Sequence, residues 1–524
     1  MTHSDDFADK PSPRTPPRSR AASSYERSRW NWPIPRLHVC ADHFTEALLY
    51  VMIVYTPWVF GTTTDRDMNI MNAVAYVLGA LLAGKWAIRT MTGFRPIRWG
   101  ENSDPTKSSL IGNHQSKTLR RITGALAILS VLVPAYCLVG ALNARASYLW
   151  SEFRFVYYDF IPWLPFTYDR TETLQWFRNT SAWALIFWAV RDWLLTKTEA
   201  EVVPEPDGET QTRRLVVPSR LRRLLWVICV NGAVLSFEAL IQRIAGTPKL
   251  LFFQETGYNR DAASQFGPFA YRANGAQYVN LIWPVCLGFW WLSHRAARVH
   301  RHPSKHYHLL LPCALIMGAG PTYSLSRGAA VINMASLGLC VGFLIGWKHE
   351  LDRLRRLALL GVLAGVALFG VQIEFDQLST RMSQIEEGLQ GREELNRKAR
   401  KMAEDYPLFG TGPGTFQQVY MLYRMTPEAY APGQLHNDWL ETRITFGWVG
   451  FLMIVGALLL VPGRWFLPGG IPMRGLFAGF IWVALVGSLV HARWDLPFQV
   501  YSIVVLFVIW CSVLFSGSKV EDGR

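Results

Sequence analysis

Residues 434–453 read QLHNDWLETRITFGWVGFLM, and this stretch places a histidine directly before an apolar segment. No residue from Ile444 to Gly463 is charged, so the segment is long enough to cross a lipid bilayer as a helix. His436 would then lie at the boundary between hydrocarbon and water. One interpretation is that it only caps the helix at the interface; the alternative is a functional group held at the membrane surface.

The rest of the chain also collects its apolar residues into long runs. Of the 524 residues, 50% are hydrophobic and 13% are aromatic. A soluble chain of this length would divide into several domains, whereas apolar runs of about 17–22 residues cross hydrocarbon as helices. We therefore predict an all-α polytopic membrane protein with about 12 transmembrane helices and one long extracytoplasmic loop containing short helices. The predicted spans are 44–60, 70–88, 122–142, 181–196, 224–241, 276–293, 308–322, 329–347, 357–373, 445–462, 475–491 and 497–516.

The distribution of Lys and Arg predicts the orientation of these spans. With a cytoplasmic N-terminus, the inside segments hold 32 of the 53 Lys and Arg residues and the outside segments hold 19. Basic cytoplasmic loops that face anionic lipid explain the net charge of +14, so no nucleic-acid partner is needed. We expect a disordered cytoplasmic tail at 1–43, a polytopic membrane domain at 44–516 and a short cytoplasmic tail at 517–524.

The cysteines and acidic residues bear on disulfides and metals. All 7 cysteines lie in predicted spans or on the cytoplasmic side, so no disulfide is expected. Asp65 and Asp67 lie in the outer loop 61–69 at a spacing that can hold a divalent cation through carboxylate oxygens. With 39 acidic residues in the chain, a chance pair is the simpler interpretation.

Two outer segments place arginines at the ends of predicted spans. Arg272 and Asn274 precede the span 276–293, where they can act as a membrane anchor and a helix cap or bind an anion at the helix N-terminus. Arg327 lies in the turn 324–328, at or slightly inside the outer membrane boundary. A guanidinium there is costly unless it is paired or faces water, which makes Arg327 a functional candidate, with simple snorkelling as the alternative.

Residues 374–444 form the long extracytoplasmic loop. Leu378, Met382, Ile385 and Leu389 follow the spacing of one helical face, and Arg392 continues that stripe unless Gly391 breaks the helix. Tyr406-Pro407 should end the helix. The glycines of 410–414 then predict a tight turn rather than a nucleotide loop, because the Lys-Ser/Thr of a phosphate-binding loop is missing.

Several of these pieces together resemble the O-antigen ligase and O-antigen polymerase family of bacterial envelope glycosyltransferases. The resemblance rests on Ser326-Arg327-Gly328, on Arg392 followed by Pro407-Leu408-Phe409-Gly410-Thr411-Gly412, and on His436-Asn437 with Gly447-x-x-Gly450. The similarity to the family is best over residues 264–500. Thr445-Phe446 departs from the family, because many members carry an acidic residue before this glycine, and the acceptor of this chain is therefore in question.

The resemblance implies that a glycan moves from a polyprenyl (undecaprenyl) diphosphate carrier to an acceptor hydroxyl, on the periplasmic face of the bacterial inner membrane. A ligase would use lipid A-core as acceptor in lipopolysaccharide assembly, and a polymerase a second lipid-linked glycan in O-antigen or exopolysaccharide assembly. Arg offers a planar fork for phosphate oxygens, and His can act as a base near neutral pH. The expected catalytic residues are His436, Arg327 and Arg392, and the expected substrate-binding residues are Arg272, Asn274, Asn437 and Arg424. We expect inversion at the anomeric carbon and no metal or other cofactor.

Two alternatives stay open from the sequence. One is a metal-dependent lipid-linked glycosyltransferase that uses Asp65 and Asp67. The other is a polysaccharide transporter or flippase without chemistry, which would more naturally place charged groups at the middle of broken helices and show internal repeats. No repeat is visible here, and the only Lys or Arg residues within the predicted spans are Lys85 and Arg191, the latter next to Asp192. His491, near the outer end of 475–491, is expected to tolerate Gln unless it lines the same cavity as His436.

Overall fold

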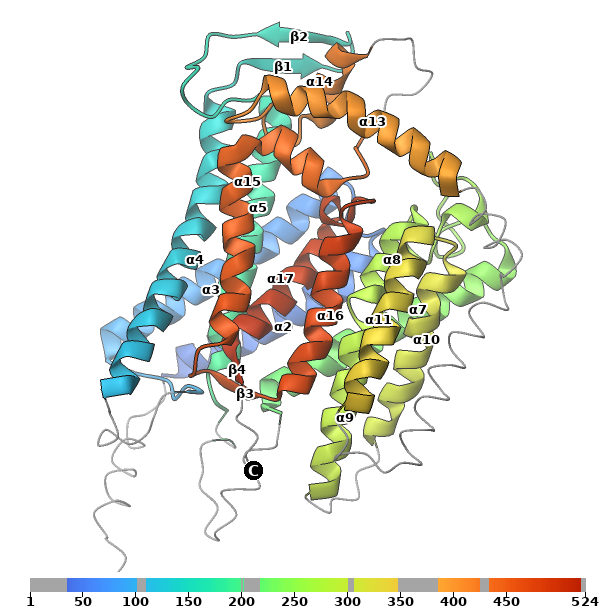
Figure 1. The fold of residues 1–524 in the computed structure, drawn as a ribbon. Coiled ribbons are helices and arrows are strands. Elements are labelled where there is room, and N and C mark those ends of the chain that lie inside the picture. Colours follow the sequence, from blue (N-terminus) through green and yellow to red (C-terminus); the bar gives the residue numbers. More distant parts are fainter. Residues whose placement is uncertain are drawn as a thin grey trace, which may run out of the picture.

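The computed structural model describes residues 35–100, 110–198, 201, 217–299, 306–346, 385–424 and 433–519. These residues form a bundle of helices with one small two-stranded sheet at each end (Figure 1). At one end β1 (Ala146–Leu149) pairs antiparallel with β2 (Arg154–Tyr157), and at the other β3 (Ile471–Met473) pairs parallel with β4 (Gly517–Lys519). We call the end that carries β1 and β2 the hairpin end.

The helices coincide with eleven of the twelve predicted spans, and the predicted span 357–373 lies outside the described residues. The segment predicted as one span at 276–293 is divided into α8 and α9, with the break at Leu281-Ile282. The helices at these spans are α2 (Arg36–Trp58), α3 (Asp65–Thr92), α4 (Leu110–Leu142), α5 (Arg170–Leu195), α7 (Ser219–Ala245), α8 (Arg272–Asn280), α9 (Trp283–Val299), α10 (Leu310–Tyr323), α11 (Arg327–Gly346), α15 (Asp438–Trp465), α16 (Gly475–His491) and α17 (Tyr501–Ser516).

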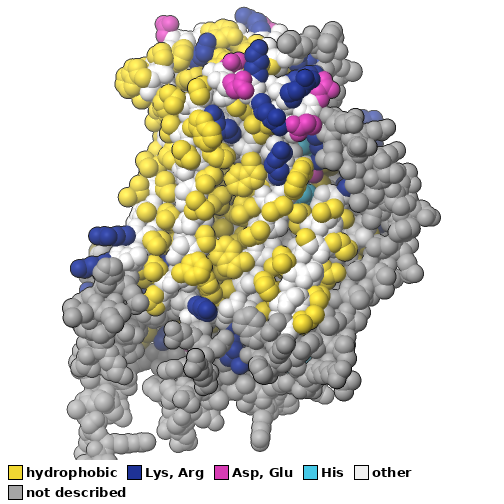
Figure 2. All heavy atoms as spheres, in the orientation of Figure 1, with side chains coloured by type: hydrophobic (Ala, Val, Ile, Leu, Met, Phe, Trp, Pro, Cys, Tyr) yellow, Lys and Arg dark blue, Asp and Glu magenta, His cyan; other side chains and the backbone are white. Residues whose placement is uncertain are grey.

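Within the described residues, six helices are long and apolar enough to cross a membrane: α2, α3, α4, α7, α11 and α15. The apolar helices α16 and α17 are shorter. On the part of the face that Figure 2 colours, hydrophobic side chains cover most of the surface between the two ends, acidic side chains gather toward the hairpin end, and Lys and Arg lie toward both ends. The chain is thus a polytopic helical membrane protein, as predicted, while the number of twelve spans stays a prediction.

The predicted N-terminal tail is shorter than expected where the structure describes it. Helix α2 begins at Arg36, so residues 36–43 belong to the bundle rather than to a disordered tail. The reason is that His38 and Asp42 are buried against charged residues of neighbouring helices instead of being solvated. At the other terminus, residues 517–519 form strand β4.

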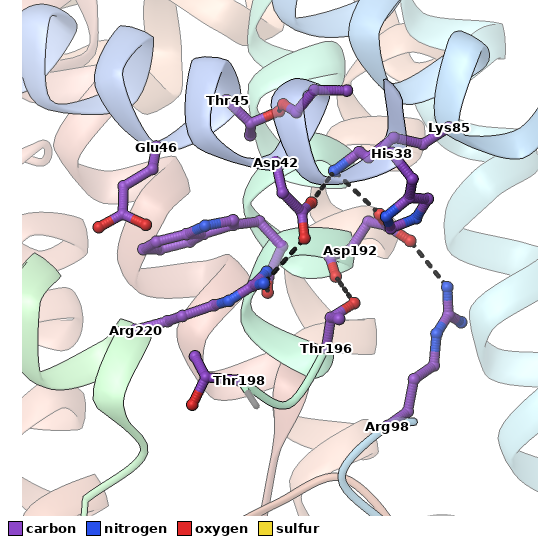
Figure 3. Close-up of polar contacts among 12 residues, drawn as sticks. His38, Asp42, Thr45, Glu46, Lys85, Arg98, Asp192, Thr196, Thr198 and Arg220 are labelled. Carbon is purple, nitrogen blue, oxygen red and sulfur yellow. Dashed lines mark hydrogen bonds and ion pairs between the residues drawn. The ribbon is translucent and has the colours of Figure 1, made fainter. Parts of the chain in front are cut away.

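Charged side chains pair inside the bundle near the end opposite the hairpin (Figure 3). Lys85, which is fully buried, lies 3.0 Å from Asp42 and 3.2 Å from Asp192. The guanidinium of Arg89 donates to both carboxylate oxygens of Asp192 in a bidentate contact, at 2.7 and 2.9 Å. The remaining pairs are Arg98 with Asp192 and Arg220 with Asp42, at 2.7 and 2.8 Å. These contacts join α2, α3, α5 and α7, so the charges of the predicted spans at Lys85 and Asp192 have partners within the protein.

Candidate active site

His436 lies in the turn that leads into α15, and its conformation is tightly constrained. Its φ of 54° falls in the left-handed region, which residues other than glycine rarely adopt. The next residue, Asn437, caps the helix by accepting a hydrogen bond from the amide of Leu440 at 3.2 Å. Glu441 reaches back to accept one from the amide of Leu435 at 2.8 Å. The helix start therefore fixes the direction of the His436 side chain from both sides.

The imidazole of His436 faces a carboxylate from a distant part of the chain. Its Nδ1 atom lies 3.1 Å from Oδ1 of Asp495, in the short loop between α16 and α17. This loop is attached to the start of α15, because the amide of Asp438 donates to the carbonyl of Ala492 at 2.9 Å. The carboxylate of Asp438 in turn accepts from the amide of Phe498 at 2.7 Å. The fold thus holds the two side chains together through backbone contacts.

Asp495 is buried among hydrogen-bond donors and cations. Its Oδ2 atom lies 3.3 Å from the hydroxyl of Tyr271 and 3.9 Å from both Arg392 Nη2 and His491 Nε2. Burial on its own would raise the pKa of Asp495. The hydrogen bond from His436 and the charges of His491 and Arg392 outweigh this effect and lower the pKa to about 2. The carboxylate is therefore ionised at neutral pH.

The ionised carboxylate decides which nitrogen of His436 carries the proton. Because a carboxylate without a proton can only accept, Nδ1 of His436 is the donor, and Nε2 of the neutral ring is left as an acceptor. About a third of the His436 side chain (33%) is exposed, so a substrate can reach it. The ring of Tyr271 packs edge-on against the imidazole at 5.8 Å. This arrangement can take a proton from a hydroxyl group.

Arg392 reaches this pair from α13 (Ile385–Asp405). The helix continues through Gly391 and ends before Tyr406-Pro407, as the sequence predicts. The guanidinium of Arg392 donates to the carbonyl of Trp494 and, at 3.4 Å, to the hydroxyl of Tyr271, and 35% of the side chain is exposed. Leu378 and Met382 of the predicted stripe lie outside the described residues.

The Ser326-Arg327-Gly328 motif lies against the same cluster at Gly328. Arg327 is the half-buried first residue of α11. A β-carbon at Gly328 would lie 3.0 Å from Nε2 of His491, so the first turn of α11 passes directly against that imidazole. His491 is itself 1% exposed and 3.9 Å from Asp495. His491 therefore lies in the same cluster as His436, and the expectation that it tolerates Gln stays a prediction.

The four predicted substrate-binding residues are placed differently. Asn437 donates to Asn396 of α13 at 3.4 Å and joins the helix of Arg392 to the turn of His436. Arg272 begins α8 next to Tyr271, but its Nη1 atom donates to the carbonyl of Ala263 at 2.7 Å. Asn274 is buried in the same helix. Arg424 follows η5 (Met421–Tyr423) and donates to the sulfur of Met421 at 3.6 Å.

The glycine motifs have a backbone role beside the site. Gly447 adopts φ 61° and ψ −172°, which interrupts α15, and the segment from Pro407 to Gly412 pairs with the interruption. Trp448 and Val449 donate to the carbonyls of Pro407 and Leu408 at 2.9 and 3.1 Å. In return, Thr411 and Gly412 donate to Ile444 and Thr445, both at 3.0 Å. The glycines at 410, 412 and 414 all have positive φ, as expected for a tight turn.

Asp65 and Asp67 lie in the first turn of α3, where Asp67 has a structural role. Thr64 and Asp67 bond reciprocally, through a hydroxyl-to-carboxylate contact of 2.7 Å and an amide-to-hydroxyl contact of 3.2 Å. This is the pattern of a helix cap. Among the described residues, no group of three or more His, Cys, Asp or Glu could hold a metal ion.

Sequence reasoning missed Asp495, Tyr271 and Gln277, which the structure adds to the cluster. Asp495 is the sole acidic residue between the predicted spans 475–491 and 497–516 and follows His491 by four residues. An acid at that spacing after a histidine, at the end of an apolar run, is a signal that could have identified it. Tyr271 and Gln277 carry no comparable signal.

Part of the chain is similar to a known protein family. A model of the O-antigen ligase family matches residues 312–455, a segment that contains Arg327, Arg392 and His436. The match supports assignment to that family and a membrane glycosyltransferase-like function in O-antigen assembly. No curated protein matches the chain.

Proposed function

We propose that the protein transfers a glycan from a polyprenyl diphosphate to an acceptor hydroxyl, at the periplasmic face of the bacterial inner membrane. The observation that carries the proposal is the 3.1 Å contact between Nδ1 of His436 and the ionised Asp495. It leaves Nε2 of His436 as an acceptor, and the guanidinium of Arg392 contacts the same Asp495 and Tyr271. A base next to a cation is what the chemistry needs, because a proton must leave the acceptor while negative charge develops on the diphosphate.

The step balances with these groups alone. The acceptor oxygen attacks the anomeric carbon and its proton passes to Nε2 of His436. The bond between the anomeric carbon and the diphosphate oxygen breaks, and the diphosphate leaves with the electron pair. Arg392 and Arg327 neutralise the leaving group, with Arg272 in support, and the single displacement inverts the anomeric carbon. Asn274, Asn437 and Arg424 are proposed to contact the sugars or the carrier.

Two observations favour this proposal over its alternatives. A metal-dependent transferase would use Asp65 and Asp67, but Asp67 is engaged in capping α3. A transporter would use charged groups within the spans, but Lys85 and Asp192 pair with each other and with neighbouring residues away from the hairpin end. The acceptor is lipid A-core for a ligase or a second lipid-linked glycan for a polymerase, and supplying each in turn distinguishes the two.

The test is transfer by purified protein, with extracted lipid-linked glycan as donor and product followed on a gel. His436→Ala should lower the rate by about 10²–10⁴, because the base is lost, and Asn437→Ala should cost less. Activity should survive chelation by EDTA and the double change Asp65→Ala with Asp67→Ala. A His436→Ala protein that works at the wild-type rate would refute the base, and loss of activity in EDTA that magnesium restores would favour the metal-dependent alternative.

The periplasmic location has its own test. Reporter fusions at 112, 210 and 300 should report the cytoplasm, and fusions at 160, 260 and 385 the opposite side. A cytoplasmic signal at 385 would contradict the proposed site, because α13 carries Arg392.

A further inference from the structure

His491 is a buried imidazole that the proposed mechanism does not use. It is the last residue of α16, and its Nδ1 atom lies 2.8 Å from Oε1 of Gln277 in α8. Both residues are 1% exposed. Nε2 of His491 and Nε2 of Gln277 have no hydrogen-bond partner among the described residues. Polar atoms buried in this way normally have a role that offsets the cost of desolvation.

The group that Nε2 of His491 faces is Asp495, whose Oδ2 atom is 3.9 Å away. An ionised carboxylate favours a proton on this nitrogen, and the Gln277 contact permits one. If the Gln277 oxygen accepts from Nδ1, the ring can carry a second proton on Nε2; if the amide is reversed, Gln277 donates to Nδ1 and the neutral ring carries its proton on Nε2. The first arrangement presents an N–H group toward Oδ2 of Asp495 when the ring carries both protons, and the second presents one in the neutral ring.

Asp495 thus lies between two imidazoles, one at each oxygen. Oδ1 faces His436 at 3.1 Å and Oδ2 faces His491 at 3.9 Å. The amide of Leu496 also donates to Oδ1 at 3.1 Å, which resists rotation of the carboxylate about its own axis. A proton on His491 opposes the same rotation from the other side.

The ring of His491 also touches the element that begins with Arg327. Gly328 leaves room for Nε2, since a β-carbon there would approach it to 3.0 Å and the ring carbon Cδ2 to 3.4 Å. On its other side the ring is bonded to Gln277, in the helix that begins with Arg272. One side chain therefore touches the first turn of α11, helix α8 and the loop that carries Asp495.

We propose that His491 is a positioning residue that holds Asp495 in line with His436 and fixes the start of α11 relative to that pair. The proposal rests on the proposed glycan transfer for its kinetic consequences only. Its structural content, that the proton of His436 stays on Nδ1 because His491 orients Asp495, holds for the protein without substrate.

The variants His491→Asn and His491→Gln separate orientation from packing. Asn keeps a polar atom near the position of Nδ1, for Gln277, but has nothing at the position of Nε2. Gln extends an amide toward Asp495 and can still donate to it. We expect His491→Asn to lower kcat by about 10–100-fold, in line with the loss of outer partners of metal-bound histidines, with little change in KM for the donor. His491→Gln should recover most of the rate. Equal losses in both variants, with lower Tm in both, would indicate packing alone and overturn the proposal.

A matched pair of glycine changes in α11 tests the contact with the ring. Gly328→Ala should press on Nε2 and lower kcat as His491→Asn does. Gly338→Ala in the same helix should have no effect, because a β-carbon there meets nothing within 4 Å. Equal activity of the two alanine variants would remove α11 from the proposal.

A second measurement does not depend on activity. Nitrogen-15 NMR of the histidine side chains in the full-length protein reports which ring nitrogen carries the proton, with His436→Gln identifying the signals of His436. We expect the Nδ1-protonated form in the wild type and a mixture of forms in His491→Asn. An unchanged His436 signal in His491→Asn would overturn the positioning role. A wild-type protein that transfers no glycan but shows the expected change would overturn the proposed function alone.

Discussion

The carboxylate of Asp495 is hydrogen-bonded to Nδ1 of His436 at 3.1 Å although the two residues are 59 positions apart in the chain. Replacing Asp495 by Asn keeps the size of the side chain but removes the negative charge that holds the proton of His436 on Nδ1. We expect the rate of glycan transfer to fall by about 10² or more, because the imidazole would lose the charge that fixes its tautomer and stabilises it as it takes up a proton. The gel assay of product formation measures the rate. Asp159→Asn, at an exposed position on the hairpin side, should be neutral, and an equal loss in both variants would argue against a specific pair.

Asp495 also predicts how stability depends on pH. The pKa of Asp495 in the folded protein is about 2, below the value of about 3.9 in an unfolded chain. A carboxyl with a lowered pKa contributes its full stabilisation above the unfolded value and loses it as pH falls toward the folded value. Below about pH 4 the stability difference between wild type and Asp495→Asn should therefore shrink, by about 2 kcal/mol in total. Thermal unfolding in detergent measures this, and a difference that grows in acid would contradict the assignment.

Arg392 and Arg327 are expected to require the guanidinium fork and not only a positive charge. Arg392→Lys and Arg327→Lys should each lose most of the transfer activity at normal expression, because a lysine cannot hold two phosphate oxygens at once. Arg397→Lys is the matched control, since Arg397 is exposed on the same helix as Arg392. Full activity of both lysine variants would show that these residues only anchor the chain at the membrane surface.

The interruption of α15 predicts a strong effect of one methyl group. A β-carbon at Gly447 would collide with the carbonyl group of Leu408, and the φ of 61° disfavours alanine as well. Gly447→Ala should therefore abolish accumulation of folded protein. Gly456→Ala in the same helix should accumulate normally, since a β-carbon there meets only Leu129 at 3.7 Å. Size-exclusion chromatography of the two variants distinguishes a local collision from a general intolerance of alanine in α15.

The positions of the helices could be predicted from the sequence, because apolar runs that cross a membrane leave a direct signal. The end of α13 before Tyr406-Pro407 was also predicted, because Pro constrains the backbone locally. The turn at 410–414 was predicted in the same way from its glycines. The break between α8 and α9 was not predicted, because the sequence there remains apolar through Leu281 and Ile282.

The candidate site was predicted only in part. His436, Arg327 and Arg392 came from their positions relative to the spans and from the family resemblance. Asp495 and Tyr271 depend on which helix ends meet at the hairpin end, and no local pattern carries that information. Asn437 is an example. Its side chain caps α15 and contacts Asn396, and the sequence alone could not distinguish these structural roles from contact with a sugar.

The cluster around Asp192 predicts a large loss of stability when one charge is removed. Asp192→Asn would leave Arg89, Arg98 and Lys85 short of their shared carboxylate, and breaking a buried pair typically costs about 3–5 kcal/mol. Glu152→Gln, in an exposed pair with Arg154, should cost at most about 1 kcal/mol. Thermal unfolding of both variants provides the comparison, and equal losses would contradict the role of burial.

The same cluster has a consequence for how the chain is assembled during synthesis. Lys85 of α3 shares its charge with Asp42 of α2, which precedes it, and with Asp192 of α5, which is made more than a hundred residues later. An unpaired charge is costly in lipid, so α2 and α3 can satisfy each other early, whereas α5 has to join helices already in the membrane. We therefore expect the ribosome-bound chain to keep α2 and α3 near the insertion machinery until α5 emerges.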